Sequence, residues 1–400
     1  MLKIDHFFEN FIKKDSFFID KSVLLSSYVP DEVLYREEQL QEVANILAPA
    51  LRMEKPSNLF IYGKTGTGKT LSMKYILRSM IDISGKNNIS LKSVYINCKL
   101  KRVADTEYRL IARLIQEYGQ DIPPTGLPTD EVYSIFYKLL DQRRHLLLLV
   151  LDEIDQLTKK IGDEILYNLT RINTELKNSQ LCLIGISNNL VFAEHLDPRV
   201  KSSLSGEELI FPPYNAMQMQ DILRSRAAKA FRENIIQPGV IEKCSAYAAR
   251  EHGDARRAID LLRIAGELAE RSNASKIDLI HLDEAEHKID SDTIINATKN
   301  QPKQFQSVLY AILLISPQKR NFFTGEIYEV YKNLCKQCKF NVLTQRRISD
   351  ILAELDMQGI IKATIISKGR YGRTREITLS LEENTITKLK EILEKALHLS

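Results

Sequence analysis

Several features are missing from this sequence, and each absence excludes a class of protein. The longest apolar run, from Leu146 to Leu151, is far shorter than the roughly 20 residues that a membrane-spanning helix needs. The first residues, Met1 to His6, lack the charged and then apolar arrangement of a secretory signal. The five cysteines are odd in number and scattered, which is typical of a reducing compartment. We therefore expect a soluble cytoplasmic protein with no membrane partner.

Metal-binding and nucleophilic motifs are also lacking. Cys335 and Cys338 have the spacing of zinc ligands, but no second pair follows them. Ile327, Tyr331 and Leu334 share a helical face with Cys338, which favours packing in a core over metal binding. The seven histidines are dispersed, with no nucleophile–histidine–acid set.

Length and charge set the broad organisation. The chain has 400 residues, of which 44% are hydrophobic, enough for two or three domains with their own cores. Residues 301–400 hold 16 Lys and Arg against 10 Asp and Glu, a balance of +6. The other 300 residues hold 40 and 42, a balance of −2. A polyanionic partner should therefore bind mainly to the last quarter of the chain.

The most informative motif is a glycine-rich segment that follows the apolar residues 59–62 and precedes a helical pattern. It has the form GxxxxGK[ST] and consists of Gly63, Lys64, Thr65, Gly66, Thr67, Gly68, Lys69 and Thr70. In this strand–loop–helix context the backbone N–H groups surround phosphates, and the helix N-terminus adds its positive dipole end. Lys69 would reach the β- and γ-phosphates, and Thr70 would offer a hydroxyl to Mg²⁺.

A second acidic motif completes the expected nucleotide site. Asp152 and Glu153 directly follow the apolar residues 146–151. An acid at the end of a buried strand beside a phosphate loop holds the Mg²⁺ shell, so we assign that role to Asp152. Glu153 would then polarise the attacking water as a general base. ATP binding, with ADP as the product of hydrolysis, is the expected chemistry.

Further polar residues lie where they would serve a phosphoryl-transfer site. Asn188 follows the apolar residues 181–186 and would touch the γ-phosphate, although Ser-Asn-Asn is also ordinary turn chemistry. Arg199, Arg256 and Arg257 would supply positive charge to the transition state, or they are simply surface arginines.

The order of the patterns predicts several parts of the chain. Continuous apolar runs separated by helical patterns indicate a parallel α/β sheet buried on both faces. These runs are residues 59–62, 93–97, 146–151 and 181–186. Pro212 and Pro213 end this part, and residues 216 to about 288 have only helical patterns. Within them, Asp254 precedes a helix with one apolar face, formed by Ala255, Ala258, Ile259, Leu262, Ala265 and Ala269. The expected divisions are an N-terminal extension (1–27), an α/β base (28–213), a helical lid (214–290), a polar linker (291–304) and a C-terminal domain (305–400).

The C-terminal domain has the pattern of a winged helix. Its helical segments are 306–315, 325–338 and 344–358, and its strands are 360–367 and 376–380. The third helix would enter the major groove of DNA, with an N-cap at Thr344 and base-edge contacts from Gln345, Arg346 and Arg347. The hairpin tip would add Lys368, Arg370, Tyr371, Arg373 and Arg375, of which Arg370 and Arg373 would enter the minor groove. A basic hairpin is often only a solvated turn.

Taken together, these motifs resemble those of AAA+ ATPases of the archaeal replication-initiator family, relatives of the eukaryotic origin recognition complex and its helicase loader. The similarity covers nearly the whole chain. It is carried by Tyr28-Val-Pro-Asp-Glu-Val-Leu-Tyr-Arg36, Leu196-Asp-Pro-Arg-Val-Lys-Ser-Ser-Leu204, Phe211-Pro-Pro-Tyr-Asn215, Arg250-Glu-His-Gly-Asp-Ala-Arg-Arg257 and Gly369-Arg-Tyr-Gly-Arg-Thr-Arg375.

The resemblance implies roles for single residues. Asn188 would be the first sensor. Arg256 would be the lid arginine that contacts the bound nucleotide, with Arg257 as the less favoured candidate for that role. Arg199 would be the arginine finger that completes the site of a neighbouring subunit. Pro30 and Arg36 would lie on the adenine side of the pocket, with Tyr214 beside the nucleotide. Many relatives have a Ser-Arg pair where this chain has Ser202-Ser203. Residues 122–128 resemble an insertion that makes a second DNA contact, although a proline-stiffened surface loop is the simpler interpretation.

The resemblance therefore implies a replication initiator that binds origin duplex DNA, recruits a replicative helicase of the minichromosome maintenance type, and uses ATP hydrolysis as a switch. Paralogous initiators or a second copy of the chain would be its partners on DNA, at the nucleoid. Two alternatives remain. One is a nucleotide-stabilised DNA-binding regulator with little catalysis, and the other a clamp-loader-like ATPase, which the basic wing disfavours.

Overall fold

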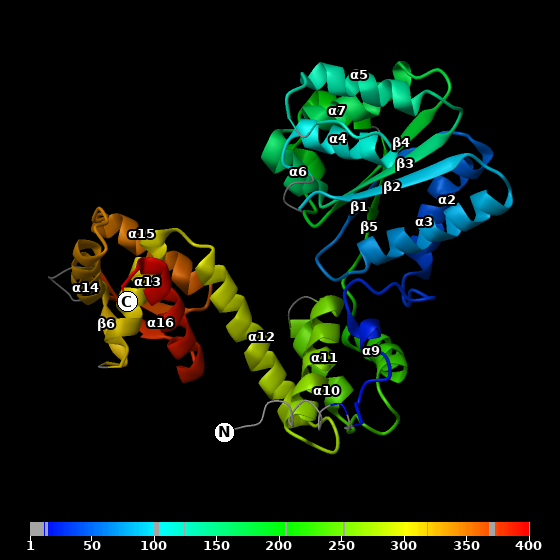
Figure 1. Cartoon of the computed structure of the whole chain (residues 1–400). Helices are drawn as coiled ribbons and strands as arrows, with labels where there is room; N and C mark the ends of the chain where they lie inside the picture. The colour runs from blue at the N-terminus through cyan, green and yellow to red at the C-terminus, as the bar shows by residue number, and fades with distance from the viewer. Residues whose placement is uncertain are drawn as a thin grey trace. The chain divides into compact units, whose positions relative to one another are not determined.

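The computed structural model describes Ile12 and residues 15–99, 104–123, 125–204, 206–250, 253–317, 319–367 and 373–399. The chain divides into two compact units, Met1–Leu282 and Asp283–Ser400. Figure 1 labels their helices and strands. No helix of the described residues is both long and apolar enough to span a membrane.

A five-stranded parallel sheet is the centre of the first unit. Its strands lie in the order β2-β3-β4-β1-β5. They are β1 (Asn58–Tyr62), β2 (Leu91–Asn97), β3 (Leu146–Asp152), β4 (Gln180–Ser187) and β5 (Gly206–Ile210). The four predicted strands and their parallel pairing are confirmed. The fifth strand was not predicted, because its exposed Glu207 and Glu208 interrupt the apolar pattern at the sheet edge.

Helices cover both faces of this sheet (Figure 1). One face carries α4 (Glu107–Glu117), α5 (Thr129–Leu140), α6 (Ile154–Ile161), α7 (Glu164–Arg171) and α8 (Pro198–Leu204). The other carries α2 (Glu37–Leu47), the 3-10 helix η2 (Ala48–Arg52) and α3 (Lys69–Lys86). The short helices η3 (Ile172–Thr174) and η4 (Phe192–His195) join other elements.

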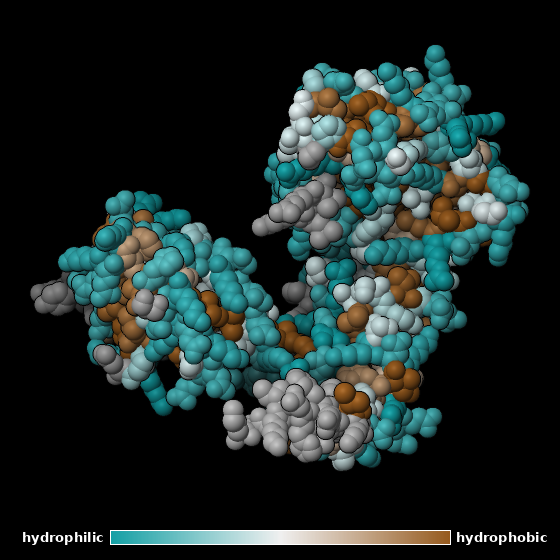
Figure 2. Space-filling model, viewed as in Figure 1, coloured by the Kyte–Doolittle hydropathy of each residue, from teal (hydrophilic) through white to brown (hydrophobic). Residues whose placement is uncertain are grey.

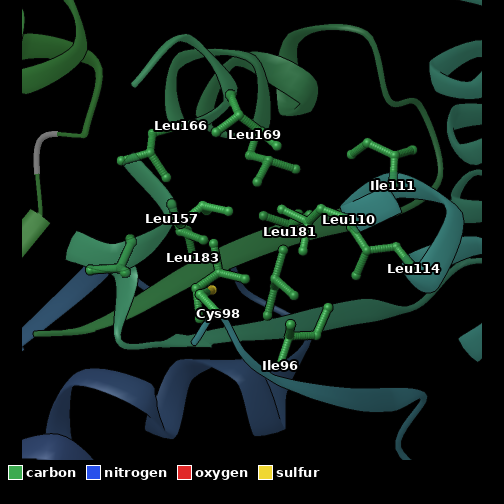
Figure 3. Packing of buried hydrophobic residues seen from close by; sticks show 14 of the residues in the cluster. Ile96, Cys98, Leu110, Ile111, Leu114, Leu157, Leu166, Leu169, Leu181 and Leu183 are labelled. Atoms are coloured by element: carbon green, nitrogen blue, oxygen red, sulfur yellow. The ribbon is translucent and has the colours of Figure 1, made fainter. Parts of the chain in front are cut away.

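The continuous apolar run of β3 follows from this double burial. Leu147, Leu149 and Leu151 pack in the core under α4 to α8, whereas Leu148 and Val150 pack under α2 and α3. Figure 3 shows the first of these cores, where leucines of α4 and α7 meet side chains of the sheet. The surface that faces the viewer in Figure 2 is mostly hydrophilic, and its apolar residues lie in separate groups.

Three helices form the lid of the first unit. They are α9 (Ala216–Ala230), α10 (Val240–Arg250) and α11 (Ala255–Arg271), and the 3-10 helix η1 (Lys21–Leu24) packs against α9 and α11. Most of the apolar face predicted for α11 is buried, with Ala258, Leu262, Ala265 and Ala269 in the core. Ala255 and Ile259 instead line a cavity.

The expected linker at residues 291–304 is largely helical, because helix α12 spans Leu279–Lys299. The polar character of this segment hides two well-buried residues, Ile295 and Thr298. Ile295 belongs to the core of the second unit, so the end of α12 is part of that domain.

The second unit is a winged helix. Its elements are α13 (Lys303–Ile315), β6 (Asn321–Phe323), α14 (Thr324–Gln337), α15 (Gln345–Met357), β7 (Ile361–Ser367), β8 (Arg373–Leu379) and α16 (Glu383–Leu397). The strands form an antiparallel sheet in the order β6-β8-β7. Strand β6 and helix α16 were not predicted. The predicted packing of the cysteine segment in a core is confirmed for Ile327, Tyr331 and Leu334, which are buried. Cys338 is only partly buried against this core, and Cys335, which was not predicted on this face, is fully buried.

Candidate nucleotide-binding site and DNA-binding surface

The strand order brings the predicted motifs of the first unit together. Strand β4 lies between β1 and β3, and all three are parallel. Because the carboxyl ends of parallel strands meet at one edge, the residues after these strands converge there. They are the phosphate loop after β1, Asp152 and Glu153 at the end of β3, and Asn188 after β4.

Lys69 lies at the centre of this edge and is almost fully buried. Its ammonium donates to the carbonyls of Gly63 and Lys64, at 2.7 Å each, and to Asn188 Oδ1 at 2.9 Å. Asn188 is therefore held against the lysine and is more than a turn residue. Burial lowers the pKa of Lys69 to about 8, against the opposing attraction of Asp152.

The Asp152 carboxylate accepts three hydrogen bonds. Oδ2 accepts from the Thr70 hydroxyl at 2.8 Å and from the hydroxyl of Tyr95 on β2, and Oδ1 accepts from the Glu153 N–H at 3.0 Å. The two predicted magnesium ligands, Thr70 and Asp152, are thus adjacent oxygens, the donors that Mg²⁺ prefers. Tyr95 was not predicted, because its role depends on β2 pairing with β3. Burial and the nearby carboxylate raise the pKa of Tyr95.

Glu153 adopts a left-handed backbone conformation with φ of 56° between β3 and α6. Its side chain is 15% exposed, and one carboxylate oxygen lies 3.7 Å from Lys99 Nζ. The carboxylate therefore stands at the same strand end as Asp152 and is only partly open to solvent.

The lid contacts the phosphate loop at Gly66, whose φ is 71°. The Asp254 side chain caps α11 by accepting from the Arg256 N–H at 2.9 Å, and the Ala255 N–H donates to the Gly66 carbonyl at 3.4 Å. A Cβ on Gly66 would lie 1.9 Å from Asp254 Oδ1, so only glycine fits here. Arg256 is exposed and lines the cavity between lid and loop; Arg257 is half-buried one residue further on.

Arg36 supports the phosphate loop. Its guanidinium donates to the Thr67 carbonyl at 2.9 Å and to the Pro212 carbonyl, and it stacks 3.9 Å from the centroid of the Tyr214 ring. Burial lowers the pKa of Arg36. Of the residues expected beside the nucleotide, Pro30 and Tyr214 line the cavity. The Arg36 side chain instead bonds to the backbone of the phosphate loop, at the Thr67 carbonyl.

The cavity has lining residues that the sequence did not indicate. Ile222, Arg226 and Lys229 reach it from α9, and Ile259 from α11. Arg226 is buried, which lowers its pKa, and its guanidinium donates to the Val23 carbonyl at 3.0 Å. These residues are far from the motifs in sequence, and nothing in the local pattern marks them.

Two other predicted elements lie on the surface of the first unit. Arg199 is 85% exposed on α8, where its Nε lies 3.2 Å from Asp197 Oδ1. It is not among the residues that line the cavity. The proposed insertion at residues 122–128 is an irregular segment between α4 and α5, apart from Pro124, which lies outside the described residues. The Tyr108 hydroxyl donates to the Pro123 carbonyl and fixes this segment to α4.

The predicted DNA-reading helix is α15. Thr344 caps it by accepting from the Arg347 N–H at 3.4 Å, as expected, and Gln345, Arg346 and Arg347 are exposed in its first turn. The opposite face is buried, as predicted, through Ile348, Ile351, Leu352 and Leu355.

The expected wing is only partly described. Strand β8 begins at Arg373, paired with Ser367 of β7. Arg375 donates from Nη1 to the Ser349 carbonyl on α15 at 2.9 Å, so it links the wing to the helix. Lys368, Arg370 and Tyr371 lie outside the described residues.

Comparisons with known proteins agree with this architecture. Residues 52–191 match the family model of an AAA domain, residues 220–287 a Cdc6 AAA+ ATPase-type lid domain, and residues 296–389 the CDC6 C-terminal winged helix domain.

Whole-length relatives are similar as well. The chain is 49% identical over 397 residues to the ORC1-type DNA replication protein of Pyrococcus furiosus, covering 98% of this chain and 93% of that protein. It is 48% identical over 386 residues to ORC1-type DNA replication protein 1 of Methanosarcina mazei, covering 96% and 92%. Among solved structures, the Aeropyrum pernix ORC1 protein in complex with DNA matches with a TM-score of 0.82 and 42% identity, covering 97% of this chain and all of that one.

Proposed function

Because this chain belongs to the ORC1-type DNA replication proteins, we propose that it is an ATP-dependent initiator that binds origin duplex DNA and helps to recruit the replicative helicase. One observation carries the nucleotide part of this proposal. Two hydrogen-bonded pairs, Lys69 with Asn188 and Thr70 with Asp152, lie together at the end of the sheet, under the start of α11. That arrangement is suited to the phosphates of ATP with Mg²⁺.

The chain's own residues divide the work at this site. The backbone of residues 63–70 binds the phosphates, and Lys69 neutralises the terminal ones. Thr70 and Asp152 would hold Mg²⁺, which would screen the charge of the phosphate oxygens. Glu153 takes a proton from the attacking water, and Asn188 orients that water or the γ-phosphate.

The lid contributes Arg256, which lies on the cavity at the start of α11 and would contact the bound nucleotide. Pro30 and Tyr214 would form part of the nucleobase side. Arg199 is exposed, as a residue that completes a neighbouring copy's site must be. In our proposal hydrolysis to ADP changes the contact between lid and loop and acts as a switch.

Substitutions at two residues test this division of roles. Lys69→Ala should abolish nucleotide binding, whereas Glu153→Ala should retain ATP and lose about 10²- to 10⁴-fold in turnover, the usual contribution of a general base. Radiolabelled ATP binding and phosphate release measure the two effects separately. Equal turnover by wild type and Glu153→Ala would contradict the role of Glu153.

The DNA part rests on the exposed first turn of α15. Gln345, Arg346 and Arg347 would meet base edges and phosphates in the major groove, supported by Thr344 as the cap. Lys368, Arg370, Tyr371, Arg373 and Arg375 would extend the contact along the wing. The relative from Aeropyrum pernix was solved in complex with DNA, which supports this assignment.

Selection from a genomic fragment library across a salt series tests the DNA part. Arg346→Ala should lose enrichment of discrete loci, whereas Lys336→Ala, an equal loss of charge on the exposed side of α14, should keep it. Uniform, salt-sensitive recovery by the wild type would mean that only the DNA backbone is bound, and would favour an initiator recruited by another protein.

The second candidate is a nucleotide-stabilised DNA-binding regulator. The hydrogen bonds of Lys69 and Asp152 fit this candidate equally well, because the same contacts stabilise the site whether or not turnover occurs. Wild-type ATP turnover at the background rate, together with no capture of a minichromosome maintenance helicase, would establish this candidate over the initiator.

A further inference from the structure

One wall of the cavity consists of residues that precede the sheet in sequence. Among its lining residues, Leu24 to Pro30 and Glu32 to Leu34 form a nearly continuous stretch. The preceding helix η1 packs against α9 and α11 of the lid. This wall therefore begins at the lid, although the sequence assigned most of it to the base.

Helix α9 holds this wall from the cavity side. Arg226 donates to the Val23 carbonyl at 3.0 Å, and its guanidinium lies 4.5 Å from the centroid of the Tyr28 ring. Lys229 pairs with Asp31 at 3.3 Å, and the Tyr35 hydroxyl donates to Asp221.

Helix α11 holds the same segment further upstream. The Phe18 ring packs with its centroid 4.7 Å from that of Phe231, the residue after α9, and both rings lie against Gly266 of α11, where an added Cβ would be 2.8 Å from each. Glu270 accepts from the Phe17 N–H at 2.6 Å, and Lys21 pairs with Glu267 at 2.8 Å.

Between Asp15 and Leu34, the hydrogen bonds and ion pairs that the structure describes to other elements end on the lid. Tyr35 contacts both parts, because its hydroxyl donates to Asp221 on α9 and its N–H donates to Glu37 Oε1 at the start of α2, at 3.2 Å. Arg36 is the point where the chain turns to the base, through its bonds to Thr67 and Pro212. We propose that residues 15–35 form an N-terminal strap carried by the lid, so that this wall of the nucleotide cavity moves with α9 and α11.

The strap gives bound nucleotide a second way to join lid and base. A nucleotide held by the phosphate loop would also touch the strap, and would thereby fix the lid through contacts beyond Arg256. Binding and strap attachment would then be coupled, and coupling free energies are reciprocal. Residues that fasten the strap but do not line the cavity should therefore change nucleotide affinity.

Phe18 and Glu270 are such residues, because neither lines the cavity. The experiment measures the dissociation constant of a fluorescent ATP analogue for the full-length chain and for Phe18→Ala and Glu270→Ala. We expect about a fivefold or larger increase in both variants, the lower range of typical coupling. Ile19→Ala is the matched control, since Ile19 is 68% exposed in the same segment and should stay within about twofold of the wild type.

Hydrogen exchange supplies the reciprocal measurement. The Ile19 N–H donates to the Ala230 carbonyl at 2.8 Å, outside the cavity. Nucleotide should slow exchange at this amide in the wild type, and less so in Phe18→Ala.

The outcomes separate this inference from the proposed nucleotide binding on which it rests. A wild type that binds no nucleotide would refute the proposed function itself. If both strap variants bind the ATP analogue with the same dissociation constant as the wild type, the strap proposal is overturned and nucleotide binding is not. The same conclusion follows if nucleotide does not change hydrogen exchange at the Ile19 amide. Unaltered exchange in α10 confirms that each variant retains the folded lid.

Discussion

The pH dependence of nucleotide binding is a direct test of the site, because burial lowers the pKa of Lys69 to about 8. In the free protein the ammonium loses its proton as the pH rises through this value. Phosphates placed beside it favour the charged form, so the complex keeps a proton that the free site has lost. Affinity should therefore be nearly constant below pH 7 and should fall above pH 8.

The size of the effect follows from the protonated fraction of Lys69. With a pKa of about 8, roughly 90% of the free sites carry the proton at pH 7 and roughly 3% at pH 9.5. The dissociation constant for ATP should therefore increase about 30-fold over this interval, and binding at pH 8 should take up about half a proton. The phosphates of ATP are already ionised in this range and add no slope.

Isothermal titration calorimetry with Mg²⁺ and ATP, in buffers with different ionisation enthalpies, measures both quantities. Lys69→Arg is the control, because a guanidinium stays charged throughout and its weaker binding should not depend on pH. A wild-type dissociation constant that is the same at pH 7 and pH 9.5 would refute the argument from burial.

Three further substitutions test other parts of the first unit. Gly66→Ala should lose nucleotide binding, because its Cβ would collide with Asp254, which caps α11. The control Gly85→Ala, in open space on α3, should bind normally, and its free energy of unfolding in urea should increase by roughly 0.5–1 kcal/mol. Normal binding by Gly66→Ala would contradict the tight contact with the lid. Ser187→Ala removes the 3.1 Å bond to the buried Asp155 carboxylate, which fixes the end of β4 just before Asn188, the proposed sensor. This variant should lower kcat about tenfold or more with little change in KM in steady-state assays, and equal effects on both constants would contradict the reasoning. Leu183→Ala should lower the free energy of unfolding by about 2–5 kcal/mol in chemical denaturation, because this side chain is fully buried in the core shown in Figure 3. A loss below about 1 kcal/mol would mean that the core collapses around the gap.

The sheet of the first unit was largely predictable because its strands are apolar on both faces. Leu147 and Leu148 point into different cores, so no polar residue interrupts the pattern of β3. Strand β5 shows where this reasoning fails, because an edge strand tolerates Glu207 and Glu208. Polarity was equally misleading at the end of α12, where buried Ile295 is surrounded by polar neighbours.

The motif residues of the site were predictable because phosphate and Mg²⁺ demand particular donors at fixed spacing. The residues that hold these motif residues and the cavity wall in place were not predictable. Tyr95 reaches Asp152 only because β2 pairs with β3, and Arg226 reaches Val23 only because α9 packs beside η1. Such contacts depend on which elements become neighbours, and no local pattern encodes that. Arg36 depends on packing in the same way: the sequence places it on the adenine side, and the fold adds its bonds to the Thr67 carbonyl of the loop and to the Pro212 carbonyl.

The C-terminal unit shows why charge alone overstates a DNA-binding surface. Arg375 was assigned to DNA by its place in a basic run, yet one of its N–H groups holds the Ser349 carbonyl of α15. A guanidinium has five N–H donors, so this bond leaves others for a phosphate while fixing the helix that carries Arg346. Arg375 would then affect DNA binding in two ways, through its own charge and through the position of α15. Arg346 would act only through its own contacts with base edges and phosphates, because it is exposed in the first turn of that helix. Neutralising Arg375 should therefore lower the salt slope and also change sequence preference, because the base-edge contacts of Arg346 depend on the position of α15 that this hydrogen bond fixes.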